Sequence, residues 1–530
     1  MLGVLRYDAT ILFISRYMNL KKIALLFGTF LLSACANGPI DETVAMDGNW
    51  KLMPECMYFS GEASGTEIVS VQQSTLRAVL SNFKTGEADI LDLSRAGKMS
   101  RLNRFSLGLK KGEEFTSVAF HPTLDVFAAV IDAGEERGRL EIRSASDGTL
   151  RDHIEVGYGP DSVIFSIDGS VLVVANEGEE FTFDRQTSEF FSAEGSISII
   201  HLDKKGHIKA NANIEMADVR HKEGFIVAAK GHFLERAIDW DGDGKISKKV
   251  DFDGNGKIDN KHVKLGRFEG ADVYGNEYKG EAKILIPLTA DAKTLLEPEY
   301  IALSPDTKRA YVTLQETNEV AEVDVENAKV LGYFDMGIAE HEADRQSDGW
   351  IEFKQSVMAL REPDGIALTP DGKYFITADE GDTDIDVQDG EEPLQSGGRT
   401  MSVFDAKTGD FVADTGNQLD EITFAHRVYP DRRSNKKGAE PEGVVAFEME
   451  GQPWAVVGME RADALVLVSL ANPKKPKVVA LGKIPGDETG SPEGVAHFVR
   501  NGEHYLLSAN EMNGTVACFK IARGEFELEH

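Results

Sequence analysis

The sequence is poor in cysteine, in aromatic residues and in basic residues, and each shortage narrows the range of functions. Only 3 of its 530 residues are cysteine and 8% are aromatic, whereas 51 are glycine, a composition that suits a turn-rich β protein. Lysine and arginine number 57 against 89 acidic residues, so the formal net charge is −32. A nucleic-acid partner is therefore not expected, because phosphate backbones are bound by basic surfaces. An acidic surface favours cations, cationic partners or simple solubility.

The sequence also lacks the motifs of several common enzyme classes. It contains no serine nucleophile elbow, no HExxH motif, no P-loop and no CxxCH motif. These absences disfavour nucleophilic and zinc chemistry and leave calcium-assisted hydrolysis as the enzymatic option. Beyond the N-terminal region, no segment is apolar for long enough to form a membrane-spanning helix.

The N-terminus has the pattern of a bacterial lipoprotein signal. Met18–Lys22 offers a second start with two lysines, and the apolar run over residues 23–32 is too short to span a membrane. The run ends in Leu-Ser-Ala-Cys35, which resembles a lipobox, and this resemblance implies that Cys35 becomes the lipidated first residue of the mature protein. We therefore expect a signal peptide over residues 1–34 and a lipidated tether over residues 35–60. An ordinary signal with a chance cysteine is the alternative.

The residues after the lipobox also predict a location. No aspartate follows Cys35 directly. By the usual sorting pattern of proteobacterial lipoproteins, this implies an outer membrane lipoprotein on the periplasmic or cell-surface side. The acyl chains would anchor the protein while the rest stays soluble.

Residues 61–530 repeat one β-hairpin unit. In its clearest copy, Glu362–Asp382, an acidic turn and an apolar run lead through Pro370-Asp371-Gly372-Lys373 into a second apolar run and a second acidic cluster. Further copies begin at Gly159, Glu297, Glu440 and Ser491, and two weaker copies span about Glu67–Asn82 and Phe115–Asp132. Seven β units at irregular spacing predict an all-β protein, a seven-bladed β-propeller with insertions.

The blade rhythm fails in one long insertion over residues 214–296. Two Asp-rich loops follow each other there at 239–260, with oxygen ligands at alternate positions and glycine at the sixth, as a calcium loop requires. Val250 and His262 stand where an EF-hand would have its bidentate glutamate, so the loops are not EF-hands. We expect them to bind Ca²⁺ in a structural role, and a merely acidic loop is the alternative. The candidate ligands are Asp239, Asp241, Asp243, Asp251, Asp253, Asn255 and Asp259.

Each clear repeat also carries carboxylates at the same two points. In a four-stranded blade, the loop that enters the first strand and the loop that leaves the second open on the same face. Ten carboxylates should then ring one mouth of the central channel, namely Asp161, Glu177, Glu299, Glu316, Asp364, Glu380, Glu442, Glu460, Glu493 and Glu511. Charges this dense raise their own pKa values or require counter-ions such as divalent cations. The alternative is that turns simply favour aspartate and glutamate.

A rare basic run precedes the Glu440 repeat. Its candidate anion contacts are Arg432, Arg433, Lys436 and Lys437. We favour a surface loop that offsets acidic neighbours, and the alternative is an anion clamp at the rim of a metal-loaded site.

The two remaining cysteines lie near the two ends of the predicted propeller. Cys56 precedes the first repeat and Cys518 lies in the last predicted strand. Because propellers usually close by pairing the chain ends in one blade, a disulfide there would clamp the closure in an oxidising compartment. Two separate buried thiols are the alternative.

Several of these stretches resemble the choice-of-anchor I family of secreted and surface proteins. The resemblance rests on residues 175–179 with 195–200, and on 297–305, 311–316 and 440–444, and it covers nearly the whole chain from about residue 60. It implies a β-propeller fold. The family includes mesenchyme-specific cell surface glycoproteins and some bacterial proteins described as alkaline phosphatases. The end of the blade-five hairpin, Ala378–Asp384, departs from the family pattern.

Three functions are compatible with these patterns. The first is a calcium-binding, membrane-anchored extracytoplasmic lipoprotein whose propeller face binds a small anionic ligand or a protein partner. The second is a calcium-dependent phosphoric-ester hydrolase, similar in principle to propeller phytases, in which clustered Ca²⁺ binds phosphate and activates water. A lactonase-like propeller is a third and weaker hypothesis, and it would also need a cation in the channel.

Overall fold

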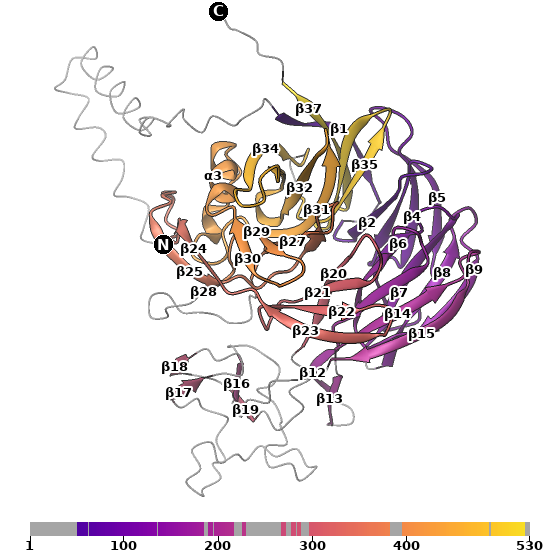
Figure 1. Cartoon of the computed structure of the whole chain (residues 1–530), viewed down its shortest axis with the longest axis horizontal. Helices are drawn as coiled ribbons and strands as arrows, with labels where there is room; N and C mark the ends of the chain where they lie inside the picture. The colour runs from indigo at the N-terminus through magenta and orange to yellow at the C-terminus, as the bar shows by residue number, and fades with distance from the viewer. Residues whose placement is uncertain are drawn as a thin grey trace, which may run out of the picture. The chain divides into compact units, whose positions relative to one another are not determined.

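Seven four-stranded antiparallel sheets form the blades of a propeller (Figure 1). The computed structural model describes residues 50–61, 63–134, 136–184, 189–193, 195–216, 225–228, 267–271, 277–281, 284–287, 296–381, 395–486 and 489–524. The predicted fold class, an all-β seven-bladed β-propeller, is confirmed. The strands of each blade are given below from the innermost to the outermost. The first strand of the chain is the outermost strand of the last blade.

The strands of the first four blades follow one another along the chain. Blade one contains β2 (Thr66–Gln72), β3 (Arg77–Asn82), β4 (Glu87–Asp92) and β5 (Ser100–Ser106). Blade two contains β6 (Glu114–Phe120), β7 (Val126–Ala133), β8 (Glu136–Ser144) and β9 (Leu150–Glu155). Blade three contains β10 (Pro160–Phe165), β11 (Val171–Asn176), β14 (Ser196–Leu202) and β15 (Ile208–Glu215). Blade four contains β20 (Pro298–Leu303), β21 (Arg309–Leu314), β22 (Glu319–Asp324) and β23 (Lys329–Asp335).

The last three blades complete the ring. Blade five contains β26 (Ile366–Leu368), β27 (Tyr374–Asp379), β29 (Thr400–Asp405) and β30 (Phe411–Asp414). Blade six contains β31 (Pro441–Met449), β32 (Gln452–Met459), β33 (Ala464–Ser469) and β34 (Lys477–Lys483). Blade seven contains β35 (Pro492–Arg500), β36 (Glu503–Asn510), β37 (Thr515–Arg523) and β1 (Trp50–Phe59). Each innermost strand contacts the next, and β35 contacts β2, so the ring of blades is closed.

Blade seven joins the two ends of the propeller. Strand β1 pairs antiparallel with β37, and Figure 1 shows the two ends of the colour scale side by side there. Residues 50–59 therefore do not belong to the tether expected over residues 35–60. The stretch resembles a tether in sequence because Pro54 interrupts its alternation. Proline is tolerated in this outermost strand, where the register shifts between Pro54 and Cys56.

Burial along the strands explains their composition. The second strand of blade three, β11, is buried at every residue, because neighbouring blades cover both of its faces. An apolar run such as Val-Leu-Val-Val-Ala fits that position. The outermost strand β9 instead alternates between exposed and partly buried residues. The core thus lies between the blades, where it holds the innermost strands in fixed positions.

Two glycines mark a repeated turn and a close approach between two blades. Gly372 ends the turn between β26 and β27 with φ of 68°, and its N–H donates to the carbonyl of Thr369. This confirms the hairpin predicted over Glu362–Asp382 for its described strands, β26 and β27. Gly443 has a different role, because a Cβ there would lie 2.0 Å from the carbonyl oxygen of Glu493. Backbones of blades six and seven therefore approach closely at the first residues of their innermost strands.

Smaller elements lie between and beside the blades. The paired strands are β12 (Glu179–Asp184) with β13 (Glu189–Ala193), β16 (Phe225–Ala228) with β19 (Ile284–Pro287), and β17 (Arg267–Ala271) with β18 (Glu277–Glu281). A three-stranded sheet contains β24 (Ile338–Ala343), β25 (Gln355–Leu360) and β28 (Gln395–Ser396). The described helices are α3 (Gln418–Ala425) and the 3-10 turns η3 (Asp431–Arg433) and η4 (Glu460–Ala462). Of the insertion predicted over 214–296, the described parts between blades three and four are β16–β19, outside the four-stranded sheets.

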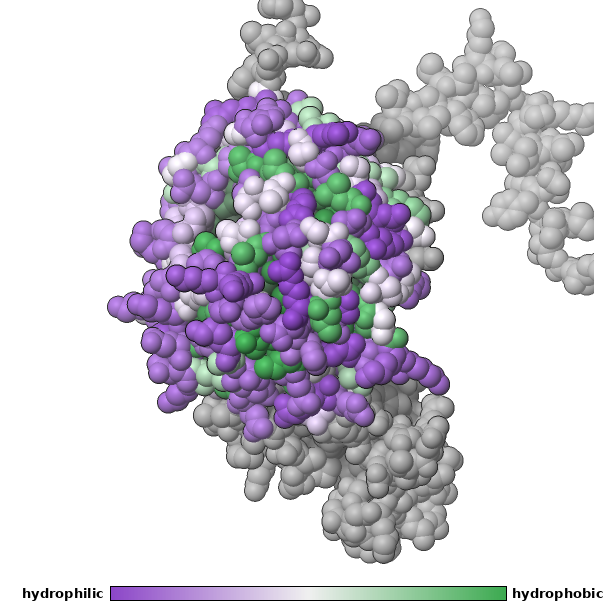
Figure 2. Space-filling view, turned by 90° about the vertical axis from the view of Figure 1, so that its right-hand side faces the viewer, coloured by the Kyte–Doolittle hydropathy of each residue, from purple (hydrophilic) through white to green (hydrophobic). Residues whose placement is uncertain are grey.

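The outer surface is mainly hydrophilic where it is visible. Figure 2 shows the side of the propeller that carries β5, β8 and β9, with hydrophobic residues confined to patches among hydrophilic ones. Among the described residues, no helix is both long and apolar enough to cross a membrane.

Candidate metal centre

An acidic residue sits in a β-bulge at the start of the innermost strand of several blades. In blades three, four, six and seven the register shifts just after the leading proline, at Asp161, Glu299, Glu442 and Glu493. In blade five, Asp364 stands just before β26, and its N–H donates to the carbonyl of the residue before Asp379. A bulge breaks the alternation of side chains along a strand and re-aims the extra residue. In these four blades, the bulge therefore turns one carboxylate away from the regular alternation of side chains along the strand.

A second acid follows the second strand of the same five blades. Glu177, Glu380, Glu460 and Glu511 come directly after β11, β27, β32 and β36, and Glu316 follows β21 by two residues. The register pairs the leading proline of each bulged strand with the end of the second strand, as for Pro441 and Met459. The two acids of each blade therefore lie at the same end of that blade.

The ten acids, which we call the acidic ring, influence one another across blades. They are Asp161, Glu177, Glu299, Glu316, Asp364, Glu380, Glu442, Glu460, Glu493 and Glu511. Burial raises the pKa of Glu299 well above its usual value, and the charges of Glu316, Asp364, Glu177 and Asp161 raise it further. Burial and then Glu460, Glu380, Glu493 and Asp364 act in the same way on the pKa of Glu442. Burial, Glu67 and Glu511 raise the pKa of Glu493 to about 10. The structure thus brings all ten into one electrostatic cluster.

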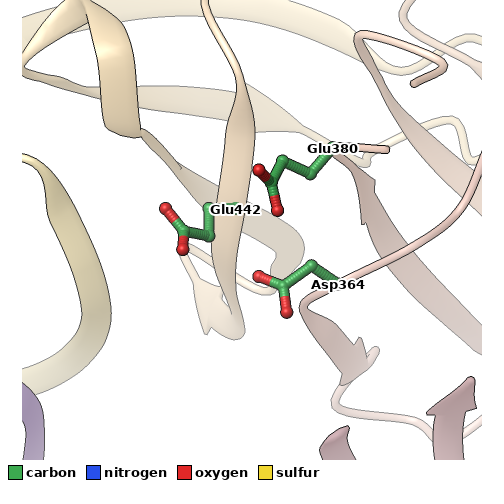
Figure 3. A group of neighbouring side chains, drawn as sticks. All are labelled: Asp364, Glu380 and Glu442. Atoms are coloured by element: carbon green, nitrogen blue, oxygen red, sulfur yellow. The ribbon is translucent and has the colours of Figure 1, made fainter. Parts of the chain in front are cut away.

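Three members of the acidic ring converge on one point. One oxygen from each of Asp364, Glu380 and Glu442 lies within 4.8 Å of the other two. Figure 3 shows the three carboxylates close together, with Glu380 and Asp364 extending toward Glu442 from separate parts of the chain. We call these three residues the triad. Asp364 is only 7% exposed.

Buried oxygens of this region have no hydrogen-bond donor in the described part of the chain. They are Oδ2 of Asp364, Oε2 of Glu442 and Oε2 of Glu299. Glu299 is only 8% exposed. Buried polar atoms are nearly always hydrogen-bonded, and burying an unpaired carboxylate is costly. A cation or a proton at these oxygens would remove that cost.

A second carboxylate group shares Glu380 with the triad but has basic partners of its own. Glu380, Glu440 and Glu460 also place one oxygen each within 4.8 Å of the others. Glu440 accepts from Arg433 at 2.5 Å and from Arg461 at 2.9 Å, and Arg461 also pairs with Glu460. The two arginines already neutralise much of this group, so the triad is the better cation site.

The basic run divides into two exposed and two inward-facing residues. Arg432 and Lys436 are exposed, whereas Arg433 pairs with Glu440 and the buried Lys437 donates to Oε1 of Glu380 at 2.5 Å. Half of the run therefore contacts the acidic cluster rather than solvent.

A family model matches most of the chain over this same propeller. The choice-of-anchor I domain matches residues 67–230, 222–393 and 383–473. The chain belongs to the choice-of-anchor I family. Membership indicates a surface or extracytoplasmic propeller protein, in agreement with the resemblance noted in the sequence.

Two solved structures match this choice-of-anchor I protein at low sequence identity. The β-propeller domain of Cps50 (Swd1) from Myceliophteria thermophila is 8% identical, with a TM-score of 0.47 over 89% of this chain and 100% of that chain. A hydrazine synthase structure from Kuenenia stuttgartiensis is 12% identical, with a TM-score of 0.48 over 89% of this chain and 100% of that chain. No curated protein matches the sequence.

The choice-of-anchor I propeller also gathers residues that the sequence patterns did not single out. Glu67 lies in the bulge of β2, and burial together with Asp161 and Glu511 raises its pKa to about 8. The sequence signal for Glu67 was Thr-Glu-Ile-Val, which matches Pro-Glu-Gly-Val of blade seven except at the proline and glycine positions. Tyr300 follows Glu299, and burial together with Asp364 and Asp161 raises its pKa well above the usual value. Its phenol therefore lies among acids of other blades.

The remaining predicted sites have mixed outcomes. The Asp-rich loops at 239–260 and the lipidation site Cys35 lie outside the described residues, so both stay predictions. Cys56 and Cys518 are direct register partners on β1 and β37, and both are free thiols. Directly opposed residues of antiparallel strands have Cα atoms about 4.5–5.5 Å apart, which falls within the range that a disulfide spans.

The chemistry of this centre follows from its ligands. Carboxylate oxygens are hard donors that suit Ca²⁺ and Mg²⁺ rather than soft metals. Two oxygens bound to one Ca²⁺ at about 2.3–2.6 Å each can be at most about 5 Å apart. The triad oxygens all lie within 4.8 Å of one another, so they fit a single Ca²⁺ ion.

Proposed function

We propose that this protein is a calcium-binding, membrane-anchored extracytoplasmic lipoprotein whose propeller binds a ligand or partner at the acidic ring. The observation that supports it best is the triad, where buried oxygens of Asp364 and Glu442 have no donor within the described residues. A divalent cation would satisfy those oxygens and lower the repulsion within the ring. The bound ion would also stabilise the folded protein, because it binds only the folded state.

The proposed anchoring and location rest on the N-terminal sequence. Lipidation of Cys35 would hold the propeller at the outer membrane, on its periplasmic or cell-surface side. The surface association of the choice-of-anchor I family supports an extracytoplasmic location. The Asp-rich loops at 239–260 would bind additional Ca²⁺ in a structural role.

A calcium-dependent phosphoric-ester hydrolase is the second candidate. The observation that favours it is the set of basic side chains beside the triad, with Lys437 and Arg461 contacting ring carboxylates. Such a site would hold phosphate between a cation and basic groups, and the cation would activate water.

Metal analysis of the purified full chain, combined with a phosphate-ester hydrolysis assay with and without Ca²⁺, separates these functions. The proposal expects bound Ca²⁺ in wild type and a smaller amount in Glu442→Gln with Glu493→Gln. Glutamine preserves the shape of these side chains but removes the charge that would hold the ion. Ca²⁺-dependent hydrolysis that the double variant lacks would establish the enzymatic candidate. Equal metal content in wild type and in the double variant would contradict a role for the acidic ring.

A further inference from the structure

Lys437 occupies an unusual position for a lysine in so acidic a protein. It is 5% exposed, and its Nζ donates to Oε1 of Glu380 at 2.5 Å and to the carbonyl of Gly381 at 2.6 Å. The other carboxylate oxygen of Glu380 accepts from Nε2 of Gln315 at 3.2 Å. Glu380 is a member of the triad, so the lysine is the built-in counter-ion of a candidate metal ligand.

The chain holds this lysine in place with a dedicated contact set. The buried Arg399 donates from Nη2 to the carbonyls of Ser434 and Lys436, and from Nη1 to the carbonyl of Asp344. The hydroxyl of Ser434 in turn donates to the carboxylate of Asp344. A buried arginine that fixes the backbone on the N-terminal side of Lys437 makes this side chain a positioned group rather than a mobile surface lysine.

The sector of the ring around Lys437 is close to electrical balance. Its carboxylates are Asp364, Glu380, Glu440, Glu442 and Glu460, and its cations are Arg433, Lys437 and Arg461. Five negative and three positive charges leave a formal charge of −2, which one divalent cation would neutralise. The largest causes that raise the pKa of Glu299 are its burial and the neighbouring carboxylates. An anion is therefore admissible in the Lys437 sector and not near Glu299.

An ammonium group and a divalent cation that share Glu380 repel each other at a separation of a few ångströms, so a bound cation weakens the contact between Lys437 and Glu380. We propose that Lys437 is a displaceable counter-ion, which a divalent cation in the triad releases from Glu380, and that the cation and the freed ammonium together hold an oxyanion such as phosphate. The inference rests on the proposed function, since it requires a cation in the triad.

The ligand class follows from the coordination that the triad leaves open. Ca²⁺ takes 6–8 oxygen ligands, and three monodentate carboxylates supply only part of that number. Oxygen atoms of a phosphate or carboxylate group can fill the remaining positions. A tetrahedral oxyanion can turn a further oxygen toward an ammonium group, which donates up to three hydrogen bonds. The order of events is then fixed, with the cation first and the oxyanion second.

Calorimetry on the full chain tests this order with Ca²⁺ and then with submillimolar inorganic phosphate. All proteins carry Asp241→Ala with Asp253→Ala, which removes candidate ligands from the Asp-rich loops. We expect Lys437→Met to bind Ca²⁺ about tenfold more tightly than its parent, a typical size for coupling between two binding events. Phosphate should bind the Ca²⁺-loaded parent, but neither the calcium-free parent nor Ca²⁺-loaded Lys437→Met. Lys373→Met, which removes an exposed lysine paired with Asp371, should match the parent in both titrations.

A measurement on the parent protein alone covers the case in which Lys437→Met fails to fold. Lys437 is acetylated with a limiting amount of an amine-reactive reagent, and mass spectrometry measures the rate. The rate of acetylation should rise with Ca²⁺ and fall again with phosphate. Ca²⁺ binding that leaves both the labelling rate and the Lys437→Met affinity unchanged overturns this inference but not the proposed function. Failure of every protein to bind Ca²⁺ overturns the proposed function and the inference together.

Discussion

The side chains of Glu299 and Asp364 interact directly, although both are acids. They come from blades four and five, and burial raises the pKa of each well above its usual value. A hydrogen bond between two carboxyl groups requires a proton on one of them. The acidic ring without a metal ion is therefore a proton-binding cluster, and metal binding must compete with those protons.

This competition predicts how the stability of calcium-free protein depends on pH. Burial is the main cause that raises the pKa of Asp161 to about 6, of Glu460 to about 7 and of Glu67 to about 8. A carboxyl whose pKa is raised by folding binds protons more tightly in the folded protein, so the free energy of unfolding falls as pH rises. Thermal melts in chelator should show a lower Tm at about pH 8 than at about pH 5, across the window that these pKa values define.

Saturating Ca²⁺ provides the control for that measurement. The ion replaces the protons, so the loss of stability with rising pH should shrink or reverse. A calcium-free protein that becomes more stable as pH rises through this window would contradict the protonated cluster.

The close approach of blades six and seven predicts a strong effect of one methyl group. In Gly443→Ala the new Cβ would meet the carbonyl oxygen of Glu493, 2.0 Å away, and the backbone beside two ring acids would have to move. We expect a loss of about 2 kcal/mol or more in the free energy of unfolding, as for other overpacked sites. Gly332→Ala is the matched control, because nothing lies within 4 Å of its Cβ position. Chemical denaturation of both variants measures the difference, and equal stabilities would show that the blades can separate freely.

The register of β1 and β37 predicts a disulfide between Cys56 and Cys518 in an oxidising compartment. The bond would tie the two chain ends within blade seven and contribute about 2–4 kcal/mol to the free energy of unfolding. Oxidised protein should be lighter than reduced protein by two hydrogen atoms and should melt at a higher temperature. Cys56→Ser should remove both differences. Two thiols that react with an alkylating reagent in denaturant, before any reductant is added, would rule out the bond.

The lipobox predicts that Cys35→Ala releases the protein from membranes. Labelling with a radioactive or clickable fatty acid, followed by detergent phase separation, measures this directly. Wild type should carry the label and enter the detergent phase, and the variant should do neither. Retention of the label by Cys35→Ala would place the acyl chain on another residue.

The sequence predicts the propeller well because its signals are local. Two apolar runs around Pro-Asp-Gly define a hairpin such as β26–β27 whatever surrounds it. The positions of the ring acids are also local, since each lies beside a repeated proline or at the end of a repeated strand. These patterns recur in five blades and allow the acids to be proposed together before the blades are seen.

Other features depend on contacts between distant parts of the chain. Strand β1 was not predicted because its partner β37 lies at the other end of the propeller and Pro54 interrupts its pattern. The pairing of Lys437 with Glu380 was missed because a run of basic residues is typical of a solvated loop. Contacts of Arg399 and Ser434, which are distant in sequence from their partners, keep this part of the run buried. Burial decides which lysine of such a run faces the acids, and burial is a property of the folded chain.

Calcium binding to the triad is the central claim, and calorimetric titration of the full chain with Ca²⁺ tests it most directly. With Asp241→Ala and Asp253→Ala as background, the parent should bind Ca²⁺ with release of protons to the buffer. Adding Asp364→Asn with Glu442→Gln should abolish that binding, because both carboxylates of the triad with unpaired buried oxygens are lost. Adding Asp371→Asn with Glu352→Gln, which removes two exposed acids outside the ring, should leave it intact. Identical Ca²⁺ titrations for the triad variant and the parent would contradict the account.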